Sequence, residues 1–172
     1  AQMGPLVTPQ HLEWVRNAIE HGLSQGADLL VDGRDVKVEA APQGFYLGPT
    51  VLDRVTPKME ILRDEIFGPV LAVTHTDDLD AAIQQCNDSG YGNAAVIFTS
   101  SGGAARKFKH SANAGMVGIN VGVPAPMAFF PFSGWRDSFF GDMHGQGRDA
   151  VEFFTQKKVV VERWFSGWSR KF

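Results

Sequence analysis

The sequence predicts an α/β protein built around parallel strands. From Pro69 onward, apolar runs of strand length alternate with segments of helical spacing, an order typical of βαβ crossovers. The runs "PVLAV", "NAAVIF" and "GMVGINV" are apolar almost throughout, as expected for strands that are covered on both faces. With 172 residues, the chain is long enough for one domain with a hydrophobic core.

The first predicted element is a helix over residues 8–26. Thr8 fits its N-cap, Pro9 its first turn and Gly26 its end. The apolar residues that share one face at helical spacing are Leu12, Val15, Ile19 and Leu23.

Two extended segments follow this helix. Residues 28–34 predict a short strand that turns at Asp32-Gly33. Residues 44–55 predict a second one, which Gly48-Pro49 interrupts, so we expect an edge strand or a bent strand.

The second half continues the alternation and then loses it. Residues 122–147 are rich in Pro, Gly and Phe without any period, which indicates a long loop of the kind that usually carries function. The other predicted elements are strands over 69–76, 93–99 and 115–121, helices over 77–88, 102–112 and 147–156, and a last strand over 157–164.

Composition excludes several classes of partner. The net charge is −3, with 16 basic and 19 acidic residues, so neither nucleic acid nor a membrane surface is expected as a partner. No apolar run approaches the roughly 20 residues that a membrane helix needs, and no signal peptide is visible. The single cysteine cannot form an internal disulfide. We therefore expect a cytoplasmic protein, or one of the mitochondrial matrix in a eukaryote, while the initial Ala leaves completeness open.

Cys86 is the one candidate for a thiol nucleophile. It shares a helix face with Leu79, Ala82 and Ile83, which places the sulfur in the core. A cysteine on an apolar stripe behaves as a small hydrophobe, and no neighbouring histidine or helix N-terminus would lower its pKa. The five histidines lack ligand spacing, so no metal site is predicted.

The segment "GQGRDA" matches the G-x-G-x-x-A fingerprint at Gly145, Gly147 and Ala150. A true dinucleotide fingerprint needs a strand before it and an acidic residue about 20 positions later. Here a polar loop precedes the glycines, so we interpret the match as fortuitous.

Two further features leave alternatives open. Glu65 opens the apolar run "EIFGPVLAV", so it is either a carboxylate satisfied at the rim of the fold or one aimed at a group that needs an acceptor. Composition alone favours the rim. A set of phenylalanines in the long loop either fills a core or forms a pocket wall: Phe129, Phe130, Phe132, Phe139 and Phe140.

The order of several motifs resembles the second half of aldehyde dehydrogenases over nearly the whole chain. These motifs are "EIFGPVLAV", "YGNAAVIFT", "GMVGINV" and "PFSGWRDS". Others resemble the CoA-acylating methylmalonate-semialdehyde dehydrogenase branch: "MGPLVT", "VDGR", "GFYLGPTVLD", "VPAPMAFF" and "FFGDMHGQG". In particular, Ser138-Phe139-Phe140-Gly141 stands where most aldehyde dehydrogenases read Ser-Gly-x-Gly.

The resemblance implies that residues 1–156 are the C-terminal part of a catalytic domain and that residues 157–172 form an oligomerisation strand and tail. It places the family's NAD-binding domain and catalytic cysteine upstream, so no catalytic residue is expected here. Cys86 does not match the nucleophile. In the family, a cysteine thiolate attacks the aldehyde, hydride passes to NAD, and in this branch the thioester is passed to CoA with loss of CO₂.

The resemblance also assigns binding residues. The glutamate that matches Glu65 accepts hydrogen bonds from the nicotinamide ribose hydroxyls, and the phenylalanine that matches Phe67 packs by the nicotinamide ring. Phe132 matches an aromatic residue of the substrate tunnel. Asn93 stands where many relatives carry Leu. Ser133 and Gly122 likewise replace a usual Gly and Pro, which implies a slightly different loop shape.

The implied ligands are NAD, coenzyme A as co-substrate and a small semialdehyde, in a homo-oligomer. Two other functions fit the same sequence. One is a hydrolytic aldehyde dehydrogenase that uses water in place of CoA, and the other is a truncated, non-catalytic assembly or binding module.

Overall fold

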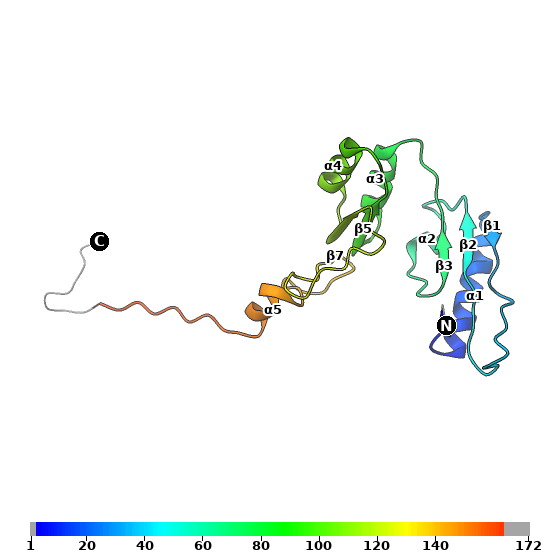
Figure 1. Ribbon diagram of the computed structural model, residues 1–172, viewed down its shortest axis with the longest axis horizontal. Coiled ribbons are helices and arrows are strands. Elements are labelled where there is room, and N and C mark those ends of the chain that lie inside the picture. The colour runs from blue at the N-terminus through cyan, green and yellow to red at the C-terminus, as the bar shows by residue number, and fades with distance from the viewer. Residues whose placement is uncertain (1–2, 164–172) are drawn as a thin grey trace. The chain divides into compact units, whose positions relative to one another are not determined.

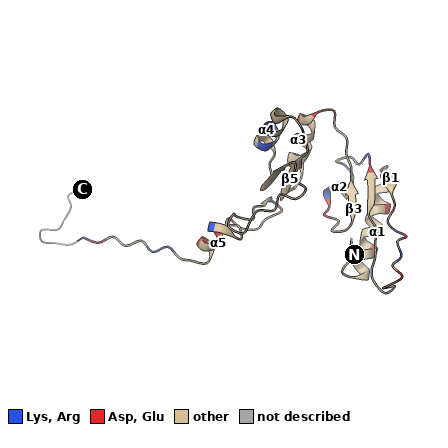
Figure 2. Ribbon diagram, viewed as in Figure 1, with Lys and Arg blue, Asp and Glu red and all other residues tan. Residues whose placement is uncertain are grey.

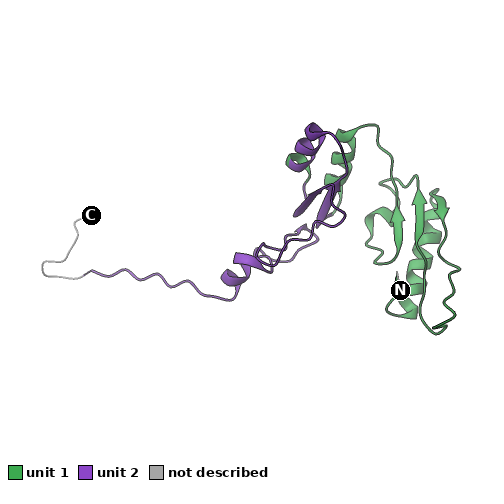
Figure 3. Cartoon of the chain, viewed as in Figure 1, with its two compact units in different colours: residues 1–90, 110–112 green, residues 91–109, 113–172 purple. Residues whose placement is uncertain are grey.

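The computed structural model describes residues 3–163 (Figure 1). The chain divides into two compact units, residues 1–90 with 110–112 and residues 91–109 with 113–172 (Figure 3). Basic and acidic residues both occur in each unit (Figure 2). No helix in the described part of the chain has the length and apolar character to cross a membrane.

The first unit is built on a three-stranded mixed sheet of order β1-β2-β3. Strand β1 pairs antiparallel with β2, and β2 pairs parallel with β3. Helix α1 contacts both β2 and the short helix α2. The elements are α1 (Pro9–Ser24), β1 (Asp28–Val31), β2 (Thr50–Asp53), α2 (Glu60–Arg63), β3 (Val70–Ala72) and α3 (Leu79–Asp88).

Helix α1 begins and buries its apolar face as the sequence predicts. The Thr8 side chain accepts a hydrogen bond from the His11 amide at 3.1 Å, and Gly26, just past the end, has a φ of +105°. Val15 and Ile19 are fully buried with Leu52 of β2. The remaining buried apolar residues of this core are Ala27, Leu47, Val55, Met59 and Ile61.

A backbone hydrogen bond between Gly33 and Gly48 connects the segment that follows β1 to the segment that precedes β2. The Gly48 amide donates to the Gly33 carbonyl at 2.8 Å, and the Gly33 amide donates to the Thr50 hydroxyl at 3.1 Å. A Cβ on Gly33 would lie 2.0 Å from the Gly48 oxygen, so any side chain there would collide with backbone. This close approach accounts for the glycines of "VDGR" and "LGPT".

The second unit contains a βαβ crossover. Strand β5 pairs parallel with β6, and α4 lies between them in the chain; a separate pair, β4 and β7, is antiparallel. The elements are β4 (Tyr91–Gly92), β5 (Ala94–Ile97), α4 (Gly102–Ser111, whose last residues belong to the first unit), β6 (Met116–Ile119), β7 (Trp135–Arg136) and α5 (Gly147–Phe153).

The structure confirms the α/β class and corrects three details. The strands form small sheets in which two parallel pairs, β2·β3 and β5·β6, accompany two antiparallel pairs. Cys86 is half-buried rather than deep in the core. Residues 157–163 form no strand, because within the described chain no sheet edge pairs with them; residue 164 lies outside the described residues.

A local ion pair fixes the turn after β1. The Arg34 guanidinium donates to Asp32 from Nε at 2.8 Å and from Nη2 at 2.6 Å, and the Arg34 amide donates to Asp32 Oδ1 at 3.0 Å. The side-chain hydrogen bond from Arg34 is the largest cause that lowers the pKa of Asp32 from 3.8 to about 2. Because the folded-state pKa is depressed, this carboxylate contributes stability above its ordinary pKa of 3.8 and loses that contribution as pH falls toward about 2.

We predict that Asp32→Asn lowers the urea midpoint of the chain at pH 6, and that the deficit shrinks as the pH is lowered through 4 toward 3. The substitution keeps an oxygen acceptor for the Arg34 amide but removes the charge. Glu39→Gln is the matched control, because the exposed Glu39 makes no hydrogen bond or ion pair with residues 3–163. A deficit that is constant with pH would contradict the role assigned to the Asp32 charge.

Candidate functional site

The residues that connect α2 to β3, 64–69, carry two of the predicted binding residues and are called the Glu65 loop here. Both ends of this loop are anchored. The Asp64 amide donates to the Glu60 carbonyl at 2.9 Å, and the Pro69 carbonyl accepts from the Thr50 amide at 2.8 Å. Between them, the half-buried Ile66 packs against the core of the first unit. The loop is therefore held close to the sheet, while the side chains of Asp64, Glu65 and Phe67 remain exposed.

Glu65 and Phe67 are both exposed on this loop. No hydrogen bond or ion pair engages the Glu65 carboxylate within residues 3–163, and the Phe67 side chain is 74% exposed. Phe67 has a φ of +49°, a left-handed conformation that bulky residues seldom adopt. A carboxylate without a protein partner can accept hydrogen bonds from hydroxyls, and an exposed aromatic ring on the same loop can pack against a flat ligand.

Helix α1 contacts the loop through two side chains. His11 Nε2 lies 2.9 Å from the Phe67 carbonyl oxygen. Since a carbonyl can only accept, Nε2 carries the hydrogen in this contact. One turn further along, Val15 packs against Gly68, where an added Cβ would lie 3.2 Å from both Val15 methyl carbons. The His11 ring in turn stacks on Trp14, with 5.6 Å between ring centroids and 13° between planes.

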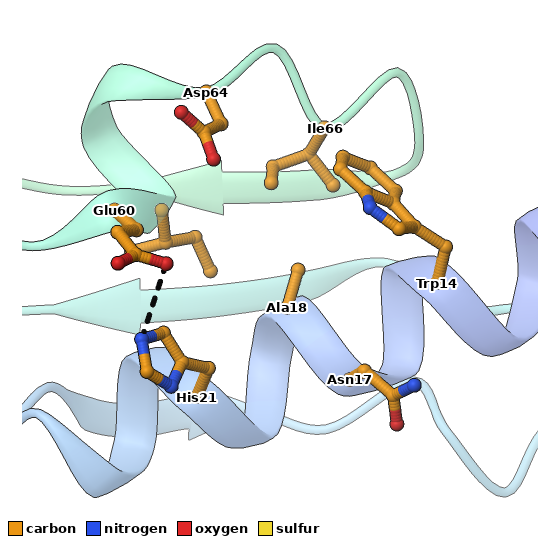
Figure 4. A pocket seen from close by; sticks show the side chains of 8 residues that line it. Trp14, Asn17, Ala18, His21, Glu60, Asp64 and Ile66 are labelled. Atoms are coloured by element: carbon orange, nitrogen blue, oxygen red, sulfur yellow. Dashed lines mark ion pairs between the residues drawn. The ribbon is translucent and has the colours of Figure 1, made fainter.

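A pocket of about 340 Å³ opens between α1 and α2 beside this loop (Figure 4). Trp14 and Ile66 lie toward one end of the view, while His21 and Glu60 face each other at the other end, with Nε2 and Oε2 3.2 Å apart. The complete lining is Trp14, Asn17, Ala18, His21, Glu60, Ile61, Asp64 and Ile66. The side chains of Asp64 and Ile66, which flank Glu65 in the chain, both contribute to this lining, so the loop forms one wall of the pocket.

Phe132 lies in the second unit, on the loop that connects β6 to β7. Its amide donates to the Gly145 carbonyl at 2.8 Å, and its ring is 43% exposed. His144 supports this bridge from the side: its Nε2 lies 3.2 Å from the Gly134 oxygen, and its ring stacks on Phe139 with centroids 4.0 Å apart. The Phe132 ring is thus partly exposed on a loop that the Phe132–Gly145 bridge and the contact from His144 to Gly134 hold together.

The phenylalanines of the long loop do not fill a core in this chain. Phe129, Phe130, Phe132 and Phe140 are all exposed, and Phe139 is half-buried against His144. Of the two readings that the sequence left open, exposure favours a wall over core filling. Residues 3–163 contain no group of three His, Cys, Asp or Glu side chains that could hold a metal ion.

The structure brings Glu65 and Phe67 together on one loop of the first unit, and it places Phe132 on the second unit. Sequence reasoning missed the supporting histidines, His11 and His144. Each has a backbone carbonyl as partner, His144 also lies 3.5 Å from the Asp149 carboxylate, and the partner of His11 lies 56 residues further along the chain. No local pattern could have identified the His11 contact.

The same fold and similar sequences occur in known proteins. The model of the aldehyde dehydrogenase family matches residues 1–160. Over 164 residues the chain is 54% identical to malonate-semialdehyde dehydrogenase 2 of Shouchella clausii (strain KSM-K16), which covers 95% of this chain and 33% of that protein. The corresponding protein of Bacillus thuringiensis (strain Al Hakam) is 50% identical over 163 residues, which is 94% of this chain and 33% of the relative.

Solved structures of similar proteins have the same fold over nearly all of this chain. A crystal structure assigned as methylmalonate-semialdehyde dehydrogenase from Sinorhizobium meliloti 1021, complexed with NAD, superposes with a TM-score of 0.93 at 43% identity, over 97% of this chain and 34% of that one. A methylmalonate-semialdehyde dehydrogenase from Oceanimonas doudoroffii gives a TM-score of 0.90 at 45% identity, over 93% and 33%.

These matches define the class. The chain belongs to the aldehyde dehydrogenase family. Its most similar relatives reported above are malonate- and methylmalonate-semialdehyde dehydrogenases, and the chain spans about a third of the length of the curated relatives it matches.

Proposed function

We propose that the chain is the C-terminal part of an NAD-dependent, CoA-acylating dehydrogenase of malonate or methylmalonate semialdehyde. The product would be acetyl-CoA or propionyl-CoA, formed with loss of CO₂. The observation that carries this proposal is the 54% identity to malonate-semialdehyde dehydrogenase 2 over 95% of the chain. The exposed Glu65 carboxylate, which has no hydrogen-bond or ion-pair partner within residues 3–163, and the exposed Phe67 ring on the same loop support it, because they suit a nicotinamide nucleoside.

Within this proposal, NAD supplies the hydride acceptor, and this chain supplies part of its binding site. The Glu65 carboxylate can accept from two vicinal ribose hydroxyls at once, since its two oxygens offer about four lone pairs. The Phe67 ring limits where the nicotinamide can swing, and hydride transfer depends on that positioning. Neither residue needs to move far, because both ends of the Glu65 loop are bonded to α2 and β2.

Phe132 is proposed as a wall of the substrate tunnel for the small semialdehyde, and coenzyme A as the co-substrate that takes the acyl group. No residue of this chain is assigned as the nucleophile. Cys86 lies on α3 (Leu79–Asp88) among the apolar residues of one helix face, as a structural side chain would.

Assembly and location complete the proposal. Residues 157–163 lie in no helix or strand, and Val159, Val160 and Val161 are 87%, 64% and 91% exposed. A β-branched segment with unpaired backbone groups is suited to join the sheet edge of another copy. We therefore propose a homo-oligomer that uses residues 157–172, in the cytoplasm or, in a eukaryote, in the mitochondrial matrix.

The full-length enzyme tests this function directly. Purified protein would be assayed with malonate semialdehyde and methylmalonate semialdehyde, with NAD, and with or without CoA, while NADH, acyl-CoA and CO₂ are quantified. The proposal requires that acyl-CoA and CO₂ form in the same amounts as NADH, and only when CoA is present. Formation of free acid at the same rate without CoA would support the hydrolytic alternative, and absence of NADH would support a non-catalytic module.

We predict that Glu65→Gln slows hydride transfer in the full-length enzyme by about ten- to a hundredfold. The amide keeps the size of the side chain but removes the charge and replaces one acceptor oxygen with a donor, so the two hydroxyls can no longer each donate to a carboxylate oxygen of their own. A charge-assisted hydrogen bond of about 1.5–3 kcal/mol sets this range. Single-turnover kinetics with deuterated aldehyde should show a larger isotope effect on NADH formation. Glu39→Gln is the control, because it removes the same charge elsewhere. An unchanged rate of hydride transfer in Glu65→Gln would contradict the cofactor-binding role and would leave Glu65 as a carboxylate at the rim of the fold.

For assembly, we predict that Val160→Pro in the full-length protein gives a smaller or aggregated species by light scattering, as deletion of residues 157–172 should. Proline removes a backbone donor and cannot continue a paired strand. Val160→Thr keeps a β-branched side chain and both backbone groups, so it should leave the oligomer intact. The same particle mass in wild type, Val160→Pro and the deletion would rule out this segment as the assembly strand.

A further inference from the structure

We infer that His11 is a positioning residue for the proposed cofactor site: it holds the backbone of Phe67 and thereby sets the direction of the Phe67 ring and the Glu65 carboxylate. This inference rests on the proposed function for its ligand. The contact itself, 2.9 Å between His11 Nε2 and the Phe67 oxygen, belongs to the first unit alone.

His11 is itself held at both ends. Its amide donates to the Thr8 hydroxyl at the start of α1, which fixes the backbone from which the side chain extends. Its ring stacks on Trp14 at 13°, which fixes the plane in which Nε2 can donate. Two restraints on the donor make the position of the Phe67 carbonyl well defined.

Phe67 needs such a restraint. A φ of +49° is unfavourable for an aromatic residue, because the Cβ crowds the backbone in the left-handed region. A loop free to relax would return Phe67 to an extended conformation and carry its ring to another direction. His11 holds the carbonyl group of Phe67, and the close packing of Gly68 against Val15 holds the residue that follows.

The contact lies outside the packed core. His11 is half-buried and is absent from the core around Val15, Ile19 and Leu52, and the Phe67 ring is mostly exposed. A local restraint of this kind affects where the loop points more than whether the unit folds. Only Ile66 separates the Phe67 ring from the Glu65 carboxylate, which has no partner within residues 3–163, so one hydrogen bond can orient two ligand-facing groups.

Two substitutions distinguish the effect of the hydrogen-bond donor from the effect of the size of the His11 ring. His11→Leu keeps an apolar side chain of similar reach over Trp14 and removes the hydrogen bond. His11→Gln restores a hydrogen-bond donor, because its amide nitrogen is as many bonds from Cβ as the Nε2 of histidine. In the full-length enzyme, His11→Leu should weaken NAD binding by about three- to tenfold, the range expected for one neutral hydrogen bond. The KM for the semialdehyde should remain within twofold, and His11→Gln should recover most of the NAD affinity.

Hydrogen exchange of the NAD-free protein provides a readout that does not depend on activity. In His11→Leu, backbone amides of residues 65–70 should exchange faster while the urea midpoint stays close to wild type, and His11→Gln should restore protection. Unchanged exchange and unchanged NAD affinity in His11→Leu would overturn the inference, as would a loss that His11→Gln fails to rescue. If wild type binds no NAD while the exchange result holds, the proposed function fails but the role of His11 in the loop stands.

Discussion

The packing of helix α1 on strand β2 is the contact on which the rest of the first unit depends. Val15, Ile19 and Leu52 leave no side chain area exposed, and the absence of a side chain on Gly22 lets Ile61 and Leu52 approach the helix to within 3.3 Å of where a Cβ would lie. The same helix also contacts the Glu65 loop through His11 and Val15. A single buried face thus fixes the sheet and, from its first two turns, the loop that presents the candidate ligand-binding groups.

Much of this architecture could be predicted because its causes are local. Thr8, Pro9 and the apolar spacing of α1 predict that helix, and the apolar runs of β5 and β6 predict parallel strands around α4. Helix α2 escaped prediction because four residues show no period, and β4 and β7 because two-residue strands are defined only by the partner across the ladder. The strand expected over 157–164 has the right composition, yet composition cannot supply an edge to pair with.

The candidate site shows the same division. The assignments of Glu65, Phe67 and Phe132 came from resemblance to a family, since a carboxylate before an apolar run has several explanations by itself. The structure adds that Glu65 and Phe67 are exposed and that the carboxylate is unengaged among residues 3–163. His11 bonds to a backbone oxygen, which any residue could provide, so no side-chain pattern marks it. His144 also lies against the side chains of Asp149 and Phe139.

The hydrogen bond between Gly33 and Gly48 has a consequence for how the chain tolerates change. With these two backbones in direct contact, the segment between them leaves and re-enters the sheet at one point, and most of residues 37–43 are exposed. Lengthening a loop whose ends are already fixed adds only a slowly growing entropic cost. Residues 37–43 are therefore a suitable place for an inserted epitope or a fluorescent label, at which the sheet and the Glu65 loop would remain undisturbed.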